Sequence, residues 1–395
     1  MKLCILCFSF IRKNIFPILI TVTMLTVAMF ILTTFVGEYH YMSYTRDVLN
    51  ESELQNGVYF MMPSDGDAER EDVQALEIRK KLETYDACAH VLTNTFFVVN
   101  YEHDFCNAFL YNHAMRENFC LEVTSGRWLS AEPAETEAVI GGVTWGNTRV
   151  GDIITLSNGI TARVVGIMGD DVLYPSFTSY DNHFQTANLL FDVNDTVIFL
   201  SQETIDPAFY TDLYSFQEDR NCYVVFSEQA SETEKQEVIR YLQTYGAVVD
   251  YDTIMENSEQ SIREWVARAF PLPLFLIVVS TISVICICTV IVKRSMTDHS
   301  KYFMIGCSKA KGFWAIVAPL TVMFSIPCAL NMISILWLPN LFRAGDHSAL
   351  INYLIRPNAI IPVIGYEILM VAVLYLIPWF FYRRYTPIAF YRRNL

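Results

Sequence analysis

Four long apolar runs lie at the two ends of the chain and enclose a more polar middle. The first covers residues 14–36, which carry no charge, and the others cover 270–292, 313–338 and 359–381. A helix needs about 20 apolar residues to cross a bilayer. We therefore predict four transmembrane helices. The first is expected to be an uncleaved anchor, because residues 33–38 offer no small-residue cleavage site of the signal-peptide kind.

The polar middle contains two segments with the same order of patterns, strand, amphipathic helix and strand. In the first, Val58 to Met62 predicts a strand, a helix follows, and Val91 to Val99 predicts the second strand. In the second, Cys222 to Phe226 and Ala247 to Asp250 predict the strands. The helices are indicated by apolar positions that share one face: Ala75, Ile78, Leu82 and Tyr85 in the first, and Val238, Leu242 and Tyr245 in the second, where Ser231 to Glu234 forms a capping box. Two such β-α-β units pair naturally into one α/β sandwich.

The region between these units has a different pattern, rich in strand and turn signals. Two apolar-polar runs, 152–157 and 160–166, flank Asn158-Gly159, which predicts a hairpin with a type I′ turn. We expect an inserted β subdomain over about residues 105–190. A periodic segment over about 252–269 then predicts a stalk helix, which Pro271 and Pro273 should kink or interrupt near the membrane surface.

Composition supports a membrane protein, because 53% of residues are hydrophobic and only 18% are charged, with a mean hydropathy of +0.28. Residues 37–269 hold 39 acidic and 14 basic residues, whereas the rest of the chain holds 3 and 14. The positive-inside rule places both termini and loop 293–312 in the cytoplasm and residues 37–269 outside, which predicts a multi-pass protein of the bacterial plasma membrane. So acidic a domain disfavours nucleic-acid binding.

The predicted fold class is an α-helical membrane protein with four transmembrane helices and a large extracytoplasmic α+β domain. That domain is a split β-α-β sandwich with an inserted β subdomain, carried on helical stalks. The expected domains are residues 1–36, with the cytoplasmic N-terminus and first span; residues 37–269, the outer domain; and residues 270–395, the membrane domain.

Motifs for catalysis and metal binding are absent from these 395 residues. There is no phosphate-binding loop of the Gly-x-x-x-x-Gly-Lys-Ser/Thr kind, no Gly-x-Ser-x-Gly and no His-Glu-x-x-His. We expect no enzyme, no bound cofactor and no metal. Four cysteines lie in the outer segment, Cys88, Cys106, Cys120 and Cys222, and their number permits one or two disulfides or free thiols.

Two polar residues inside the predicted spans, Glu367 and Asn331, are candidates for a functional role. Glu367 is the one carboxylate well inside a span, and an intramembrane acid is a functional candidate by default. A hydrogen-bonded Glu367 that faces Tyr366, Asn331 or a partner subunit is the structural alternative to an ion or proton site.

Three stretches resemble one known family. The first is the outer segment Leu121 to Leu129 together with residues 137–141, 150–156 and 164–168; the second is Asp298 to Ser308; the third is Tyr385 to Arg392. Together with the span layout, they resemble the MacB/FtsX-like permeases of ATP-binding cassette (ABC) transporters. Within Asp298 to Ser308, Ser300 stands where the family has glycine, and Phe303 where it has a basic residue.

The resemblance implies a permease that handles a peptide, drug or lipid-linked substrate at the outer face. Its partners are expected to be cytoplasmic ABC ATPases, which bind ATP and Mg²⁺, a second permease in a homodimer or heterodimer, and membrane lipid. The ATPase-coupling residues are then Asp298, Lys301, Tyr302, Phe303, Ile305, Gly306, Cys307 and Ser308. An FtsX-type scaffold that activates a cell-wall hydrolase and a membrane-anchored enzyme or sensor remain alternatives.

Overall fold

A computed structural model of the chain describes residues 12, 15–63, 68–101, 104–141, 148–169, 172–177, 189–192, 197–201, 215–217, 220–304, 306, 308–342 and 357–384. The chain divides into two compact units. The membrane unit comprises Met1–His40 and Trp265–Leu395, and the outer unit comprises Tyr41–Glu264.

The described helices and strands follow the predicted order of one span, a mixed outer unit and three further spans. The membrane helices are α2 (Ile15–Glu51), α7 (Pro271–Met304), α8 (Lys309–Phe342) and α10 (Pro357–Arg384). The outer helices are η1 (Glu53–Asn56), α3 (Ala68–Leu82), α4 (His113–Asn118), α5 (Glu232–Gln243) and α6 (Tyr251–Ala269). The strands are β1 (Gly57–Met61), β2 (Cys88–Leu92), β3 (Asn94–Tyr101), β4 (Asp104–Tyr111), β5 (Ser125–Gly126), β6 (Glu137–Gly141), β7 (Ile153–Thr155), β8 (Thr161–Met168), β9 (Leu173–Pro175), β10 (Leu190–Asp192), β11 (Val197–Leu200), β12 (Ser215–Gln217), β13 (Cys222–Phe226) and β14 (Ala247–Asp250).

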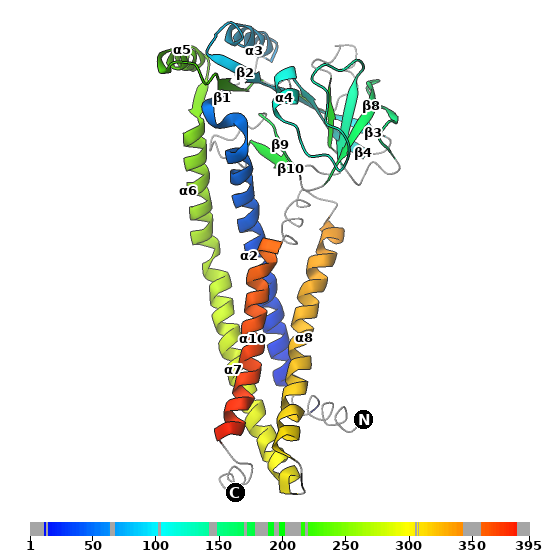
Figure 1. Cartoon of the computed structure of the whole chain (residues 1–395), viewed down its shortest axis with the longest axis vertical. Helices are drawn as coiled ribbons and strands as arrows, with labels where there is room; N and C mark the ends of the chain where they lie inside the picture. Colours follow the sequence, from blue (N-terminus) through cyan, green and yellow to red (C-terminus); the bar gives the residue numbers. More distant parts are fainter. Residues whose placement is uncertain are drawn as a thin grey trace. The chain divides into compact units, whose positions relative to one another are not determined.

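The two β-α-β units interleave in one four-stranded sheet. Its strand order is β14-β1-β13-β2, so each unit has a strand of the other between its own two strands. Tyr59 of β1 lies directly opposite Tyr223 of β13 at the centre of the sheet, and both side chains are buried. Helices α3 and α5 pack their apolar positions on one face of this sheet (Figure 1). The sandwich expected from the sequence is therefore present.

Both helices of this layer end with the same local structure. The sequences Leu82-Glu83-Thr84-Tyr85 and Leu242-Gln243-Thr244-Tyr245 occupy matching positions after α3 and α5. In each, the threonine Oγ1 donates a 2.6 Å hydrogen bond to the carbonyl three residues earlier, and the leucine is fully buried. This shared C-terminal structure supports the internal repeat that the sequence pattern indicates.

The inserted region forms a separate eight-stranded sheet in the order β12-β3-β4-β11-β6-β8-β5, with β7 paired to β8. It extends from Asn94 to Gln217, beyond the expected limits of 105 and 190. The single strand predicted over Val91 to Val99 is wrong, because the chain leaves the first sheet at Thr93 and β3 pairs with β4 instead. Asn94 fixes this crossing by accepting a 2.9 Å hydrogen bond from the Phe177 backbone N–H.

The predicted hairpin is present, but its turn differs from the prediction. Strands β7 and β8 pair with Thr155 opposite Thr161, whereas the Leu156 N–H donates to the Ile160 carbonyl and the Gly159 N–H to the Leu156 carbonyl. Gly159 has a φ of +88°. These bonds define a three-residue loop that ends in a left-handed glycine, the second common hairpin connection, and not a two-residue type I′ turn.

The membrane unit consists of α2, α7, α8 and α10, and all four contribute to one apolar core (Figure 1). Four helices in the described residues are long and apolar enough to cross a membrane, as predicted. Threonine hydroxyls within the spans donate hydrogen bonds to backbone carbonyls of their own helix. In α2, for example, Thr21 donates to the Pro17 carbonyl at 2.9 Å and Thr33 to the Met29 carbonyl at 2.8 Å.

The two prolines after the stalk helix interrupt the helix less than expected. Helix α6 ends at Ala269 and α7 begins at Pro271, so one residue separates them. The Phe270 N–H still donates to the Val266 carbonyl at 2.9 Å, and the Leu274 N–H to the Phe270 carbonyl at 3.1 Å. Both prolines lie in the first turn of α7. Backbone N–H groups in the first turn of a helix have no acceptor within that helix, so the lack of an N–H in proline removes no hydrogen bond from α7.

Candidate functional site

The connection between α7 and α8 is a tight turn at the end of a long helix. The sequence predicted a loop over 293–312, but residues up to Met304 are helical and α8 begins at Lys309. Residues 293–304 are mostly polar but contain neither glycine nor proline. No helix-breaking residue therefore ends α7 where its side chains become polar. Gly306, with a φ of +94°, follows the end of α7 and donates its N–H to the Phe303 carbonyl at 3.0 Å.

Ser308 begins the next helix. Its Oγ accepts a hydrogen bond from the Lys311 N–H at 3.4 Å, the position of an N-cap. Its carbonyl accepts from the Gly312 N–H at 3.1 Å. Gly306 and Ser308 of the predicted coupling segment therefore have structural roles, ending one helix and starting the other.

The other predicted coupling residues lie on the last turns of α7 or between the helices. Lys301 is exposed and Phe303 is half-buried. Asp298 and Tyr302 are helical positions whose side chains lie outside the described structure, and so do Ile305, Cys307 and the closing motif 385–392. The structure thus brings Lys301, Phe303, Gly306 and Ser308 to one helix-turn-helix corner.

The intramembrane polar residues contact different partners. Glu367 on α10 is half-buried and shares a hydrogen bond with Cys328 on α8. Asn331, one turn further along α8, donates to Thr33 Oγ1 on α2 at 3.3 Å. Tyr366 hydrogen-bonds Ser280 on α7 at 2.7 Å. The predicted pairing of Glu367 with Tyr366 or Asn331 is not what the described contacts show.

These contacts join all four spans through polar side chains. Tyr366 and Ser280 connect α10 to α7, Asn331 and Thr33 connect α8 to α2, and Tyr375 lies 3.4 Å from Thr321 between α10 and α8. Within lipid the hydrophobic effect does not drive helices together. Hydrogen bonds of this kind therefore help to orient the helices. With its thiol partner, Glu367 fits this set of helix contacts.

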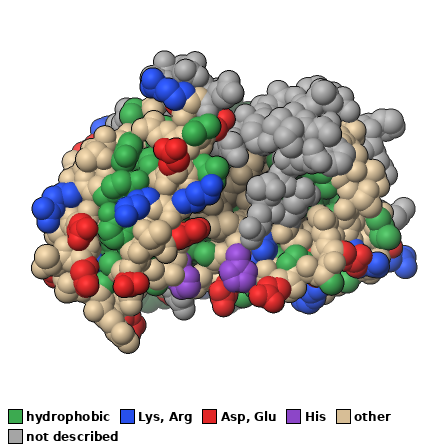
Figure 2. Space-filling model, turned by 90° about the horizontal axis from the view of Figure 1, so that it is seen from above, with side chains coloured by type: hydrophobic (Ala, Val, Ile, Leu, Met, Phe, Trp, Pro, Cys, Tyr) green, Lys and Arg blue, Asp and Glu red, His purple; other side chains and the backbone are tan. Residues whose placement is uncertain are grey.

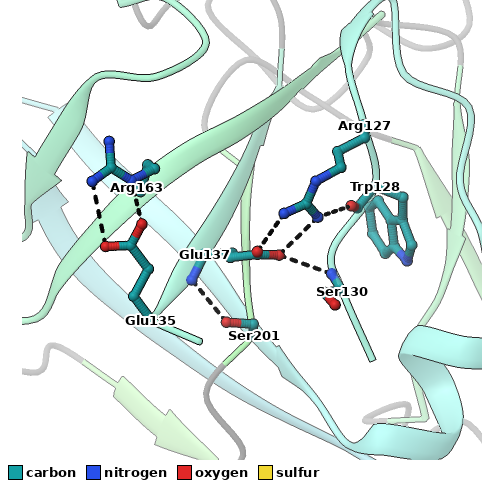
Figure 3. Close-up of polar contacts among 7 residues, drawn as sticks. All are labelled: Arg127, Trp128, Ser130, Glu135, Glu137, Arg163 and Ser201. Atoms are coloured by element: carbon teal, nitrogen blue, oxygen red, sulfur yellow. Dashed lines mark hydrogen bonds and ion pairs between the residues drawn. The ribbon is translucent and has the colours of Figure 1, made fainter. Parts of the chain in front are cut away.

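In the outer unit, Glu137 is the centre of a buried polar cluster (Figure 3). Its side chain is 7% exposed, and its carboxylate accepts hydrogen bonds from both terminal nitrogens of Arg127 and from the Ser130 N–H. The Glu137 backbone N–H donates to Ser201 Oγ at 2.8 Å. Glu137 therefore fastens the segment after β5 and the end of β11 to the first residue of β6.

Burial alone would raise the pKa of Glu137. The hydrogen bonds from Arg127 and from the Ser130 N–H, and the charges of Arg127 and Arg116, outweigh burial, so the pKa lies below its ordinary value. Glu137 is therefore ionised at neutral pH and cannot donate a proton to a substrate.

Arg116, on α4, is a buried basic residue that the sequence reading missed. It donates to the carbonyls of Tyr111, Ser201 and Ala131 at 2.6, 2.9 and 2.9 Å. Its three acceptors are backbone carbonyls, which every residue has. No pattern of side chains in the sequence therefore indicates that Arg116 is buried. It meets the Glu137 cluster at Ser201, which both residues contact.

Two glycines permit the close approach that brings Arg127 to this cluster. A Cβ on Gly126, whose φ is +87°, would lie 2.2 Å from the Val165 carbonyl oxygen, and one on Gly166 would lie 2.3 Å from that of Arg127. Trp128 then packs its ring on Tyr111 and Phe199. Residues 126–128 (Gly-Arg-Trp) and residues 164–167 (Val-Val-Gly-Ile) therefore form the two sides of one close backbone contact.

The four outer cysteines, Cys88, Cys106, Cys120 and Cys222, form no disulfide among the described residues. Burial raises the pKa of Cys88 to about 11, so this thiol stays protonated at neutral pH. Within the described residues, no group of three or more His, Cys, Asp or Glu side chains could hold a metal ion. On the face shown in Figure 2, acidic and basic side chains are interspersed, despite the acidic net charge of the domain.

Part of the chain is similar to known proteins. Residues 18–241 match the family model of the MacB-like periplasmic core domain. Among solved structures, the periplasmic region of MacB from Actinobacillus actinomycetemcomitans is similar at 11% identity, with a TM-score of 0.33 over 52% of this chain and 92% of that one. The extracellular domain of the noncanonic ABC-type transporter YknZ from Gram-positive bacteria is similar at 16% identity and a TM-score of 0.29, over 48% and 92%. A search of curated proteins gave no match.

The family model covers more than half of the chain and ends within α5, so it includes the first span, the first β-α-β unit and the Glu137 cluster. The four candidate spans and the extracytoplasmic domain make this a multi-pass protein of the plasma membrane. Membership of this family also implies an ABC ATPase as partner. The chain belongs to the MacB-like family of ABC transporter permeases.

Proposed function

We propose that this chain couples ATP hydrolysis by a separate cytoplasmic ATPase to motion of its outer domain, for export or extraction of a peptide, drug or lipid-linked substrate. These 395 residues contain no phosphate-binding loop, so ATP would be hydrolysed outside them. The observation that carries the proposal is the helical corner between α7 and α8.

The corner extends beyond the apolar part of α7. Lys293 and Arg294 end the apolar run, yet the helix continues for ten more residues to Met304. At 1.5 Å per residue this adds about 15 Å of helix past the basic boundary. Lys301 and Phe303 lie on this extension, and Lys309 and Lys311 are exposed on the first turn of α8. A short, stiff projection with basic and aromatic side chains fits a groove on a partner protein.

Helical continuity supports the second half of the proposal. When two ATPase subunits close on ATP, they would draw paired corners together, and α7 would transmit the movement toward α6. The Phe270 N–H bonds the Val266 carbonyl and the Leu274 N–H bonds the Phe270 carbonyl, so hydrogen bonds span both proline positions and help this segment to resist bending. Substrate handling would then take place at the outer domain.

The test is purification of the tagged full-length chain in mild detergent, with identification of the copurified proteins and an ATPase assay. We expect a stoichiometric ATPase, and an about tenfold lower yield of it for the double variant Tyr302→Ala/Phe303→Ala, the loss typical of two central interface residues. Thr297→Ala is the matched control, because Thr297 lies on the same helix and its hydroxyl bonds the Lys293 carbonyl of that helix.

Three results would count against the proposal. Absence of any ATPase would favour a membrane-anchored enzyme or sensor. An equal loss for the control would mean that the corner is not the contact. Copurification of a cell-wall hydrolase through the outer domain would favour an FtsX-type scaffold over a transporter.

A further inference from the structure

The adjoining ends of α8 and α10 carry exposed cations next to exposed aromatic rings. Phe313 near the start of α8 and Tyr382 near the end of α10 are in ring contact, with centroids 5.9 Å apart, so these two helix ends are neighbours. Lys309 and Lys311 belong to this end of α8, and Arg383 and Arg384 to this end of α10, and all four are exposed.

The two arginines fold back along their own helix. The Arg383 guanidinium lies 5.1 Å from the ring centre of Trp379, and that of Arg384 lies 5.7 Å from the ring centre of Phe380. Each ring is four residues earlier and about half exposed. These rings belong to the last turns of an apolar span, where aromatic side chains mark the level of lipid headgroups. The guanidinium charges are therefore held at headgroup depth.

Basic residues outnumber acidic ones on these helix ends. On α10 the nearest acidic residue is Glu367, which lies 16 residues before Arg383 and so about 24 Å away along the helix axis. On the neighbouring helix ends, the acidic residue is Asp298 of α7, against Lys293, Arg294 and Lys301 on the same segment. Four exposed cations on two adjoining helix ends give this place a net positive charge, which complements a phosphate-bearing ligand.

We propose that the ends of α8 and α10 form a binding site for the headgroup of an anionic phospholipid, with Arg383 and Arg384 on its phosphate and Lys309 and Lys311 beside it. The exposed rings of Trp379 and Phe380 would lie against the glycerol and upper acyl region. A lipid is favoured over a protein partner because the arginines point back toward the span, along rings that face outward from the helix bundle. This inference is independent of the ATPase coupling.

The test uses purified full-length protein, equilibrated with an equimolar mixture of phosphatidylglycerol and phosphatidylcholine in detergent, and native mass spectrometry to count the lipids retained. The double variant Arg383→Gln/Arg384→Gln should lower the ratio of bound phosphatidylglycerol to phosphatidylcholine about tenfold. The matched control, Lys293→Gln/Arg294→Gln, removes two exposed charges from the same side of the membrane and should lower it by less than about threefold.

A second variant separates position from charge. Trp379→Leu/Phe380→Leu keeps both arginines but removes the rings that hold them, and should lower the same ratio about threefold. All these side chains are exposed, so thermal unfolding in neutral detergent should match that of the unsubstituted protein. Excess glycerol phosphate should leave the bound lipid unchanged.

Several outcomes would overturn the proposal. Equal losses for the arginine and control variants would mean a diffuse positive field without a site. Displacement of the lipid by glycerol phosphate would mean a site for soluble phosphates. Loss of a copurified ATPase from the arginine variant, with its lipid ratio intact, would assign these residues to a protein contact.

Discussion

The outer unit and the membrane unit both bury polar groups, but they do so with different chemistry. In the outer unit the buried groups include ions with ionic partners: Glu137 with Arg127, and Glu71, which is 2% exposed, with Arg220. In the membrane unit the contacts between helices join neutral groups, such as Tyr366 with Ser280 and Asn331 with Thr33. Glu367, with the Cys328 thiol, is the exception.

The difference follows from what each partner loses on burial. Arg127 stays 56% exposed, so the outer ion pair keeps part of its hydration. A charge within a bilayer has no such access to water, and a neutral hydrogen bond there costs far less to bury. A domain in water can therefore use charge to fix its loops, whereas a helix bundle in lipid orients its helices with hydroxyls and amides.

The largest contrast is expected from one added methyl group. Gly166→Ala places a Cβ 2.3 Å from the Arg127 carbonyl oxygen and should destabilise the β5–β8 contact by about 3 kcal/mol. Hydrogen exchange of β8 amides in the full-length protein measures this loss. Gly365→Ala in α10 is the matched control, since nothing lies within 4 Å of its added Cβ, and it should be neutral or slightly stabilising. Equal effects at both sites would show that the close approach does not matter.

Removal of the buried charge comes next. Glu137→Gln keeps the shape but weakens three charge-assisted hydrogen bonds, and should cost about 2 kcal/mol in the same exchange measurement. Glu135→Gln affects the exposed pair with Arg163, whose side chains are 56% and 42% exposed, and should change this stability far less, because water screens the pair. A Glu137→Gln protein as stable as the unsubstituted one would remove the basis of the comparison.

Acid should act on the outer unit through the same residue. The folded-state pKa of Glu137 is lowered, so its contribution is complete above the unfolded value of about 4.3 and is lost as the pH falls through the folded value. Protection of β6 and β8 amides should therefore decline below about pH 4.3. The decline should be shallower in Glu137→Gln, and parallel curves would assign the acid sensitivity to other groups.

The smallest effect is expected in the membrane unit. Tyr366→Phe removes the 2.7 Å hydrogen bond to Ser280 and should cost about 0.6 kcal/mol, the average for such contacts between membrane helices. Tyr375→Phe, which loses an exposed 3.4 Å contact with Thr321, should cost less. Thermal unfolding of the membrane unit in detergent measures both. A cost for Tyr366→Phe above that of Glu137→Gln would reverse the comparison.

Local signals in the sequence predicted most of the elements. The four spans are confirmed, and so is the capping box, in which Ser231 and Glu234 bond each other's backbone N–H groups. The strand pattern over Val91 to Val99 failed because strand propensity does not specify a partner. Two strands of different sheets follow each other there with only Thr93 between them.

The polar clusters were less visible in the sequence. Only the family resemblance marks the Gly-Arg-Trp segment at residues 126–128, because nothing local in the sequence shows that Arg127 reaches Glu137 ten residues later. Likewise, loop 293–312 was inferred from its polar composition, which also suits a helix that has left the bilayer. Pairing and burial are long-range properties, whereas helix caps such as Ser231 depend on residues within one turn.

The interleaved sheet also constrains how the protein can be made. Strand β1 pairs on both sides with strands that follow much later, as in the contact between Gly57 and Val225, which are 168 positions apart. During synthesis β1 would therefore emerge with both edges unpaired, and would wait for the whole inserted subdomain to cross the membrane. The span that precedes it would keep this strand tethered at the bilayer during that interval, so the delay becomes a local search near the membrane instead of an encounter in free solution.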